Sequence, residues 1–156
     1  MSDPIVIDSR TGKATCRSVG MIVRHKGKIL MLDRRKGVLG WACPAGHVED
    51  GEYFFDCLLR ELEEETGLKV SGASCVLMAD INNACKRGAT AHYWEVYECS
   101  VDDPTVRLME PDKHNGIGWF TPDQLLALEL EPVWKAIFRR LGIFEKPYDF
   151  LASDDR

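Results

Sequence analysis

Residues 46–68 read GHVEDGEYFFDCLLRELEEETGL, and this stretch decides the fold. Residues 52–66 place apolar side chains such as Leu58 and Leu62 at helical spacing. Gly67 follows directly, in the position after a helix end that favours glycine. The stretch therefore predicts a helix over 52–66 that is preceded by a glycine-containing loop and packs one face on the core.

Three carboxylates lie together on this predicted helix. At about 100° per residue, Glu61, Glu64 and Glu65 share one stripe beside the apolar face. Carboxylates at this spacing repel one another, and they lie at the helix end that disfavours anions. Arg60 neutralises them in part, and a hard divalent cation such as Mg²⁺ would make the cluster favourable. A solvated acidic face is the alternative interpretation, because such faces are common.

The whole stretch also matches a longer pattern, Gly-x5-Glu-x7-Arg-Glu-apolar-x-Glu-Glu-x-Gly-apolar. A chance match has odds on the order of 10⁻⁹ per starting position. The sequence therefore resembles the Nudix hydrolase family, in its MutT-like form, and the stretch resembles an intact Nudix box. The matching positions are Gly46, Glu52, Arg60, Glu61, Leu62, Glu64, Glu65, Gly67 and Leu68.

The resemblance implies an α/β fold, namely an α/β/α sandwich with a central mixed β-sheet. It implies hydrolysis of a nucleoside diphosphate linked to another moiety, with Mg²⁺ or Mn²⁺ as cofactor. Glu64 and Glu65 match the family's main metal ligands. Glu61 matches a position that is either a further ligand or the general base, and the carbonyl of Gly46 often completes a metal site.

Two further roles follow from the resemblance. Arg60 pairs with the Glu at position 52 in the pattern, and this pair commonly holds the loop against the helix, so that Arg60 joins Glu61 and Glu64 in the catalytic machinery. Family members also place a base or ligand outside the box. The candidates here are Glu95, Glu98 and Glu110; the first two are three apart on a predicted strand, so only one of them can face the site.

Candidate substrate-binding residues lie outside the helix. Arg34 and Arg35 end a predicted strand, and the fork of an arginine suits phosphate. Arg17 lies on the first predicted strand, His47 follows Gly46, and Glu110 lies in a long loop. Each also has a plain structural interpretation as a solvated or incidental residue. The same choice, between base stacking and core packing, applies to the aromatic candidates Trp41, Tyr93, Trp94 and Trp119.

The flanking sequence predicts the remaining elements of a single domain over 1–156, with flexible ends at 1–14 and 151–156. Strands are expected over 16–23 and 28–32, as a hairpin, and over 74–81 and 91–99. A short apolar run at 38–43 stops at Pro44. Polar loops are expected over 82–90 and 101–118, and helices from Pro122 and over 132–141.

Composition excludes several functional classes. The 156 residues carry a net charge of −5 (20 − 25), so no nucleic-acid partner is expected. No apolar run reaches the roughly 18 residues of a membrane span, and residues 1–10 lack a secretory signal. None of the six cysteines forms a C-x-x-C pair, so reduced thiols in the cytoplasm are expected.

The substrate is a small-molecule nucleotide by resemblance, and many relatives are homodimers. No proline occurs from Gly67 to Asp103, which argues against one ADP-ribose-cleaving subgroup and against the NADH-cleaving signature. The first tyrosine after the box is Tyr93, which argues against one subgroup that cleaves dinucleoside polyphosphates. The default is a nucleoside or deoxynucleoside triphosphate, cleaved to a monophosphate and pyrophosphate. ADP-ribose or sugar nucleotides are the alternative, followed by a non-catalytic Nudix-fold nucleotide-binding module and, last, an isopentenyl diphosphate isomerase.

Overall fold

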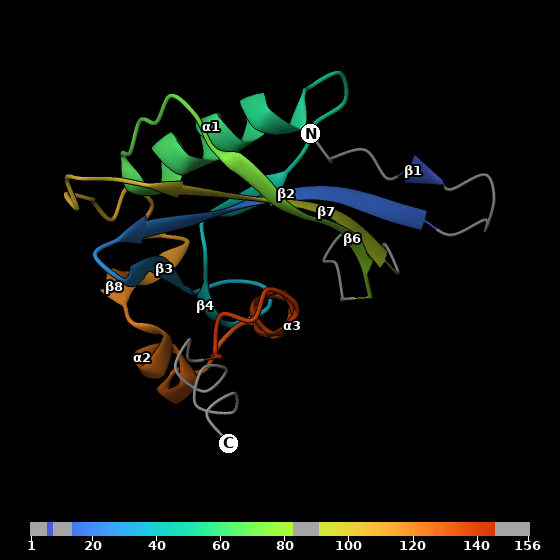
Figure 1. Ribbon diagram of the computed structural model, residues 1–156. Helices are drawn as coiled ribbons and strands as arrows, with labels where there is room; N and C mark the ends of the chain where they lie inside the picture. The colour runs from blue at the N-terminus through green and yellow to red at the C-terminus, as the bar shows by residue number, and fades with distance from the viewer. Residues whose placement is uncertain (1–5, 8–13, 83–90, 146–156) are drawn as a thin grey trace.

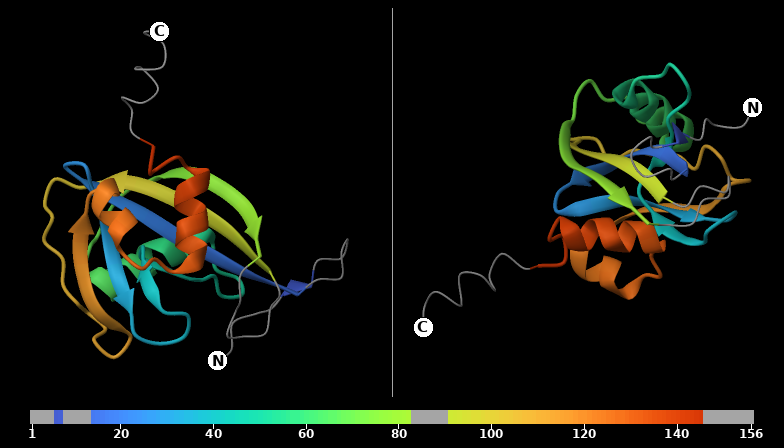
Figure 2. Two further views of the ribbon diagram at one scale, coloured as in Figure 1. Left: turned by 90° about the horizontal axis from the view of Figure 1, so that it is seen from below. Right: turned by 90° about the vertical axis from the view of Figure 1, so that its right-hand side faces the viewer.

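The computed structural model describes residues 6–7, 14–82 and 91–145. A β-sheet forms the middle layer of the molecule, with helix α1 (Phe54–Thr66) on one face. Helices α2 (Pro122–Ala127) and α3 (Pro132–Arg140) lie on the opposite side (Figures 1 and 2). The expected α/β/α sandwich is confirmed.

The sheet is mixed. Strand β2 runs parallel to β7 from Thr15 to Arg24, whereas every other pairing in the sheet is antiparallel. The main order is β4-β3-β2-β7-β6, with β8 paired to β3, and with β1 and β5 paired to β2. The strands are β1 (Val6–Ile7), β2 (Ala14–His25), β3 (Lys28–Arg34), β4 (Gly40–Ala42), β5 (Ala45–His47), β6 (Ser74–Ile81), β7 (Ala91–Ser100) and β8 (His114–Phe120).

Strand β2 separates two hydrophobic cores because its side chains alternate between faces. Val19 and Met21 belong to the core beneath α1, whereas Ile22 belongs to the core that contains α3. A Cβ atom on Gly20 would lie 2.5 Å from the ring of Trp134, so glycine lets α3 pack closely on β2. The two faces of β2 therefore meet different helices.

The secondary structure follows most of the sequence expectations, although the short strands β1 and β5 were not among them. The helix runs over Phe54–Thr66, with Gly67 at φ 78° after its end. A strand was expected only near Trp119 and Phe120, because Gly116 and Gly118 interrupt the alternation before them. Strand β8 begins as early as His114, because Ile29–Arg34 of β3 offers a partner. The expected irregular loop over 101–118 is therefore wrong for residues 114–118.

The chain ends are described in part. Val6–Ile7 pair with Ala14 and Thr15 at the start of β2, within the end that the sequence led us to expect as flexible. The loop expected over 82–90 and the end over 151–156 lie outside the described residues, apart from Asn82. No helix in the described part of the chain is long and apolar enough to cross a membrane.

Candidate active site

A cleft of about 470 Å³ opens beside the carboxylate face of α1. Its wall combines the box helix with β5, the end of β3 and the segment that leads into β8. Glu61, Glu64 and Glu65 contribute carboxylates from the helix, and Gly46 and His47 contribute from β5. The cleft therefore brings together residues that are far apart in the sequence.

Gly46 is where β5 meets the helix most closely. It pairs with Val19 of β2, and a Cβ atom at this position would collide with the carboxylate of Glu61. Only glycine lets the strand backbone approach the carboxylate so closely. The predicted ligand Glu61 and the predicted carbonyl ligand Gly46 are neighbours for this reason.

Glu61 shows the electrostatic cost of the cluster. Its pKa is raised to about 8, first by burial and then by the charges of Glu65 and Glu64, while Arg60 opposes the shift. The buried carboxylates therefore favour a cation nearby. Together with the carbonyl of Gly46 they form an all-oxygen set of the kind that Mg²⁺ and Mn²⁺ prefer, so the residues present fit the cofactor that the resemblance implies.

Glu65 is held by partners on two strands. It is 8% exposed, and its Oε1 accepts a hydrogen bond of 2.9 Å from the backbone N–H of Ala45. Its Oε2 lies 3.4 Å from Nε2 of His114. Burial raises the pKa of Glu65, and the contacts with His114 and Ala45 oppose the rise. Glu65, Glu110 and His114 also present ligand atoms within 4.8 Å of one another, so Glu110 lies beside the helix carboxylates.

Arg60 ties the loop to the helix. Its Nε and Nη2 donate to the two carboxylate oxygens of Glu52 at 3.0 and 3.1 Å. Its Nη1 lies 3.1 Å from Glu61 and 3.4 Å from Glu64. The hydrogen bonds from Arg60 lower the pKa of Glu52, and a further bond from the N–H of Glu49 adds to this. A single guanidinium thus fixes the loop and offsets the carboxylate charge.

Positive side chains line another part of the wall. Arg34 lines the cleft, and its Nη1 donates to Oε2 of the buried Glu131 at 2.9 Å. Lys113 also lines the cleft, and its Nζ lies 3.1 Å from Oε2 of Glu110. With Lys36, these cations give the cleft a basic side that suits phosphate.

Two predicted substrate-binding arginines lie elsewhere. Arg35 donates from Nη1 to the carbonyl of Pro111 at 3.2 Å, and it is not among the described residues that line the cleft. Arg17 is likewise absent from the described lining; it lies on the same face of β2 as Val19, which belongs to the core beneath α1. Its Nε is buried and has no partner among the described residues.

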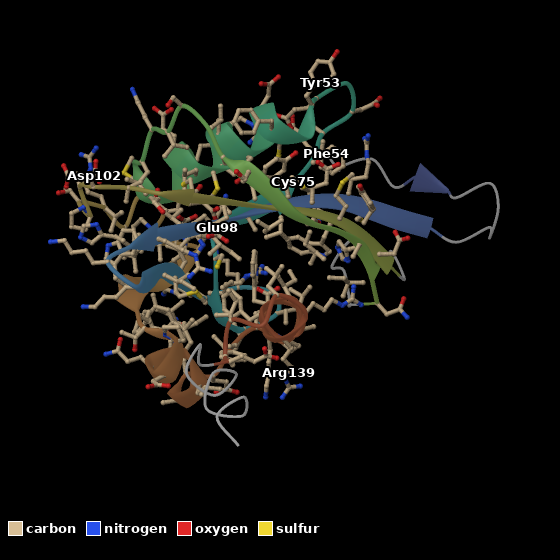
Figure 3. The ribbon with its side chains drawn as sticks, in the orientation of Figure 1. Tyr53, Phe54, Cys75, Glu98, Asp102 and Arg139 are labelled. Carbon is tan, nitrogen blue, oxygen red and sulfur yellow. The ribbon has the colours of Figure 1, made fainter. Side chains whose placement is uncertain are left out.

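Of the three candidate acids outside the helix, only Glu110 lines the cleft within the described part of the chain. Glu95 accepts hydrogen bonds from Tyr97 at 2.8 Å and Tyr93 at 3.3 Å on the α1 face of β7. Glu98, labelled in Figure 3, forms an ion pair of 2.7 Å with Arg24.

Of the four aromatic candidates, Trp94 is the only one that lines the cleft. It is 5% exposed, and its Nε1 has no partner among the described residues. Trp41 packs edge-on against Phe120, and Trp119 donates to the carbonyl of Pro104. Tyr93 packs edge-on against Phe54, which Figure 3 labels.

The sequence reasoning missed several residues of the cleft. His114 and Lys113 follow Glu110 in the segment EPDKH, and they reach the cleft because β8 pairs with β3. Glu131 precedes α3 and Ser18 lies on β2, and no local pattern marks either of them. The one sequence signal that could have identified His114 and Lys113 as cleft residues is the run of polar residues directly before strand β8.

Comparisons with known proteins agree with this geometry. The family model described as NUDIX domain matches residues 14–141. The chain is 30% identical over 104 residues to a bis(5'-nucleosyl)-tetraphosphatase [asymmetrical] of Rattus norvegicus, covering 65% of this chain and 69% of the relative. It is 25% identical over 140 residues to an RNA pyrophosphohydrolase of Novosphingobium aromaticivorans, covering 78% and 85%. A crystal structure of a MutT NUDIX hydrolase from Burkholderia pseudomallei superimposes with a TM-score of 0.63 at 28% identity, covering 70% and 84%.

Proposed function

The chain belongs to the Nudix family and is a nucleotide pyrophosphohydrolase, and we propose that its substrate is a nucleoside or deoxynucleoside triphosphate. The products would be the monophosphate and pyrophosphate. The observation that carries this proposal is the composition of one cleft, in which Glu61, Glu64 and Glu65 lie on one side and the cations Arg34 and Lys113 on another. Such a cleft is suited to hold a polyphosphate between metal-binding carboxylates and basic side chains.

The chain's residues divide the work as follows. Glu64 and Glu65, with the carbonyl of Gly46, would hold Mg²⁺ or Mn²⁺, and Glu61 would be a further ligand or the base. The bound cation supplies charge neutralisation at the phosphate oxygens and lowers the pKa of water. Arg60 positions the carboxylates through its bonds to them, as the distances above indicate.

The remaining predicted residues have separate roles in the proposal. Arg34 and Lys113 would release their present carboxylate partners and bind phosphate oxygens instead. Glu110 is the candidate acid or base outside the helix. His47 lines the cleft and stays a candidate for substrate contact. Substrate binding by Arg17 and Arg35 stays a prediction, and it would require a substrate that extends beyond the cleft.

A second substrate class has support of its own. A dinucleoside polyphosphate contains the same pyrophosphate links, and the relative from Rattus norvegicus bears the name of a tetraphosphatase of such compounds. ADP-ribose and sugar nucleotides are the third choice. These classes differ in whether a second nucleoside or a sugar follows the phosphates, so the products distinguish them.

The first experiment is a product assay on all of these classes, run with Mg²⁺, with Mn²⁺ and with EDTA. We expect metal-dependent cleavage of nucleoside triphosphates and no cleavage with EDTA. Preferred cleavage of another class would replace the proposed substrate. No cleavage of any class by folded protein that binds Mg²⁺ would favour the binding-module alternative.

Two variants of neighbouring residues test the metal-ligand assignment. Glu64→Gln removes a carboxylate from the cleft, and we expect kcat/KM to fall by more than the roughly 10- to 100-fold that loss of an outer partner of a metal ligand costs. Glu63→Gln is the matched control, because Glu63 contacts Lys69 at 3.5 Å and is not among the described lining residues. Turnover retained by Glu64→Gln would refute the assignment.

The proposal also covers the cellular compartment and the binding partners. The described cysteines form no disulfide, which supports a reducing compartment such as the cytoplasm. The proposed partner is the nucleotide substrate alone, without nucleic acid or membrane. The mass of the protein in solution tests the homodimer that the resemblance suggests.

A further inference from the structure

We propose that Cys16, His47 and His92 form a second metal site, specific for a zinc-type ion and separate from the carboxylate site. Their ligand atoms, one thiol sulfur and two imidazole nitrogens, all lie within 4.8 Å of one another. This site goes beyond the proposed hydrolysis, because neither the carboxylates nor the phosphate-binding cations take part in it.

Strand pairing brings these three residues together. Cys16 on β2 pairs directly with His92 on β7. Ser18, two residues along β2 and hence on the same face as Cys16, pairs with His47 on β5. The rings of His47 and His92 lie 5.6 Å apart between centroids. Three strands of a continuous sheet thus hold the cluster, so its geometry is set by backbone pairing.

The cluster lies on the sheet face opposite to the carboxylates. A Cβ atom on Gly46 would point at Glu61, so Gly46 faces α1. Because successive strand residues alternate, His47 points to the other face. Gly20 continues the alternation of Cys16 and Ser18 along β2 and faces Trp134 of α3, which places the cluster on the α3 side. The β5 backbone therefore separates the two groups of ligands.

The donor chemistry distinguishes the two sites. Thiolate and imidazole select Zn²⁺, Co²⁺ or Cu⁺ and bind Mg²⁺ poorly, whereas carboxylates and carbonyls select Mg²⁺ and Mn²⁺. On a tetrahedral zinc ion such ligand atoms lie about 3.3 to 3.6 Å apart, as follows from the metal–ligand bond lengths. Ligand atoms that lie within 4.8 Å of one another need side-chain adjustments of at most about 1.5 Å to reach that spacing.

Burial and exposure fit a site with three protein ligands. Cys16 is 1% exposed and His92 is 3% exposed, whereas His47 is partly accessible. His47 and His92 line the cleft, so the fourth coordination position of a bound ion would open onto it. Trp94 lies two residues from His92 on the same face, and its buried N–H lacks a partner among the described residues. That donor is available to a ligand in the fourth position.

Cobalt titration of the full chain tests this site, with Mg²⁺ in excess to fill the carboxylates. We expect one Co²⁺ per chain, with thiolate-to-cobalt charge-transfer absorption in the near ultraviolet and the strong visible bands of tetrahedral cobalt. Added Zn²⁺ should remove both features. The neighbouring group of Glu65, Glu110 and His114 contains no thiol, so binding there gives no such charge transfer.

Variants show which residues produce the cobalt absorption bands. Cys16→Ser should abolish the near-ultraviolet band and lower the cobalt affinity by at least about 10- to 100-fold. Cys75→Ser is the matched control, because Cys75 is exposed on the edge strand β6 (Figure 3), and it should leave the spectrum unchanged. His47→Gln, at a partly exposed position, should weaken binding with the fold intact, even if the buried Cys16→Ser variant does not fold.

Three results would overturn the proposal. They are the absence of a charge-transfer band in the unmodified protein, a band that survives in folded Cys16→Ser, and an unchanged cobalt affinity in His47→Gln. Each readout is spectroscopic, so hydrolytic activity does not enter the decision. A protein that fails to cleave any nucleotide but shows the cobalt spectrum would keep this site and lose the proposed substrate.

Discussion

Replacing Gly46 by alanine tests the close approach on which the carboxylate site depends. The new Cβ atom would lie 2.5 Å from Oε1 of Glu61, whereas ordinary contacts between heavy atoms are about 3.5–4.0 Å. Glu61 must therefore retreat by about 1 Å. The backbone itself is not strained by alanine, since Gly46 is an ordinary strand residue without a positive φ.

The two consequences differ in size. A displacement of about 1 Å at a catalytic group can cost about 100-fold in rate, which corresponds to about 2.7 kcal/mol. The stability cost should be at the lower end of the 1–3 kcal/mol typical of overpacking, because the displaced atoms are the end of a flexible side chain. For a domain of this size, about 1 kcal/mol lowers the melting temperature by about 2–4 °C. Activity should thus fall far more than stability.

The assay compares kcat, KM and thermal unfolding for Gly46→Ala and for Gly72→Ala. Gly72 is the matched control because a Cβ atom there meets nothing within 4 Å. We expect a loss of kcat only at Gly46. Full activity in Gly46→Ala would show that the contact between β5 and Glu61 does not govern catalysis. An equal loss in both variants would refute the steric argument.

Two further predictions concern the ends of the box helix. Thr66→Val removes a buried hydroxyl that donates to Leu62 at 2.6 Å and accepts from the N–H of Leu68 at 3.1 Å; we expect the free energy of unfolding in urea to fall by about 1–3 kcal/mol, and an unchanged value would mean that water replaces the hydroxyl. Glu52→Gln should lower the free energy of unfolding by about 1 kcal/mol at neutral pH, because it removes the charge from an ion pair with Arg60 whose side chains are 18% and 33% exposed. The pKa of Glu52 is lowered from 4.5, so its contribution is complete above that value and is lost as the pH falls through the lowered pKa. Denaturation at neutral and acid pH should therefore show the difference between Glu52→Gln and the unmodified protein closing in acid, and a constant difference would exclude the ion pair as its source.

The elements that local sequence specifies were predictable. The box helix has its own apolar spacing and its own terminal glycine, and it forms within two residues of the expected bounds. The first part of strand β8 was missed because its pattern is broken by glycines, and what stabilises it is pairing with β3, which lies 80 or more residues earlier in the chain. Pairing over such a separation leaves no local periodicity in residues 114–118.

The same distinction applies to the cleft. Glu61 and Glu64 could be assigned because they share a helix face with fixed angles. The burial of Glu65 could not, because it depends on the N–H of Ala45 and on His114, which come from two other elements. Glu95 was an equally good candidate by sequence, and only the structure shows that its carboxylate is engaged by the tyrosines beside it on β7, outside the described lining of the cleft.

Strand β5 connects the two proposed metal sites physically. The face of β5 that lacks a side chain at Gly46 meets Glu61, and the next residue, His47, lies near the thiol of Cys16 on the neighbouring strand β2. A zinc-type ion that fixed His47 would fix the orientation of the adjacent Gly46 carbonyl through one peptide unit, whose planarity leaves few ways to move one without the other. The hard and soft ions would then bind without competing for ligands, because their donor sets do not overlap, yet each would restrict the same short strand.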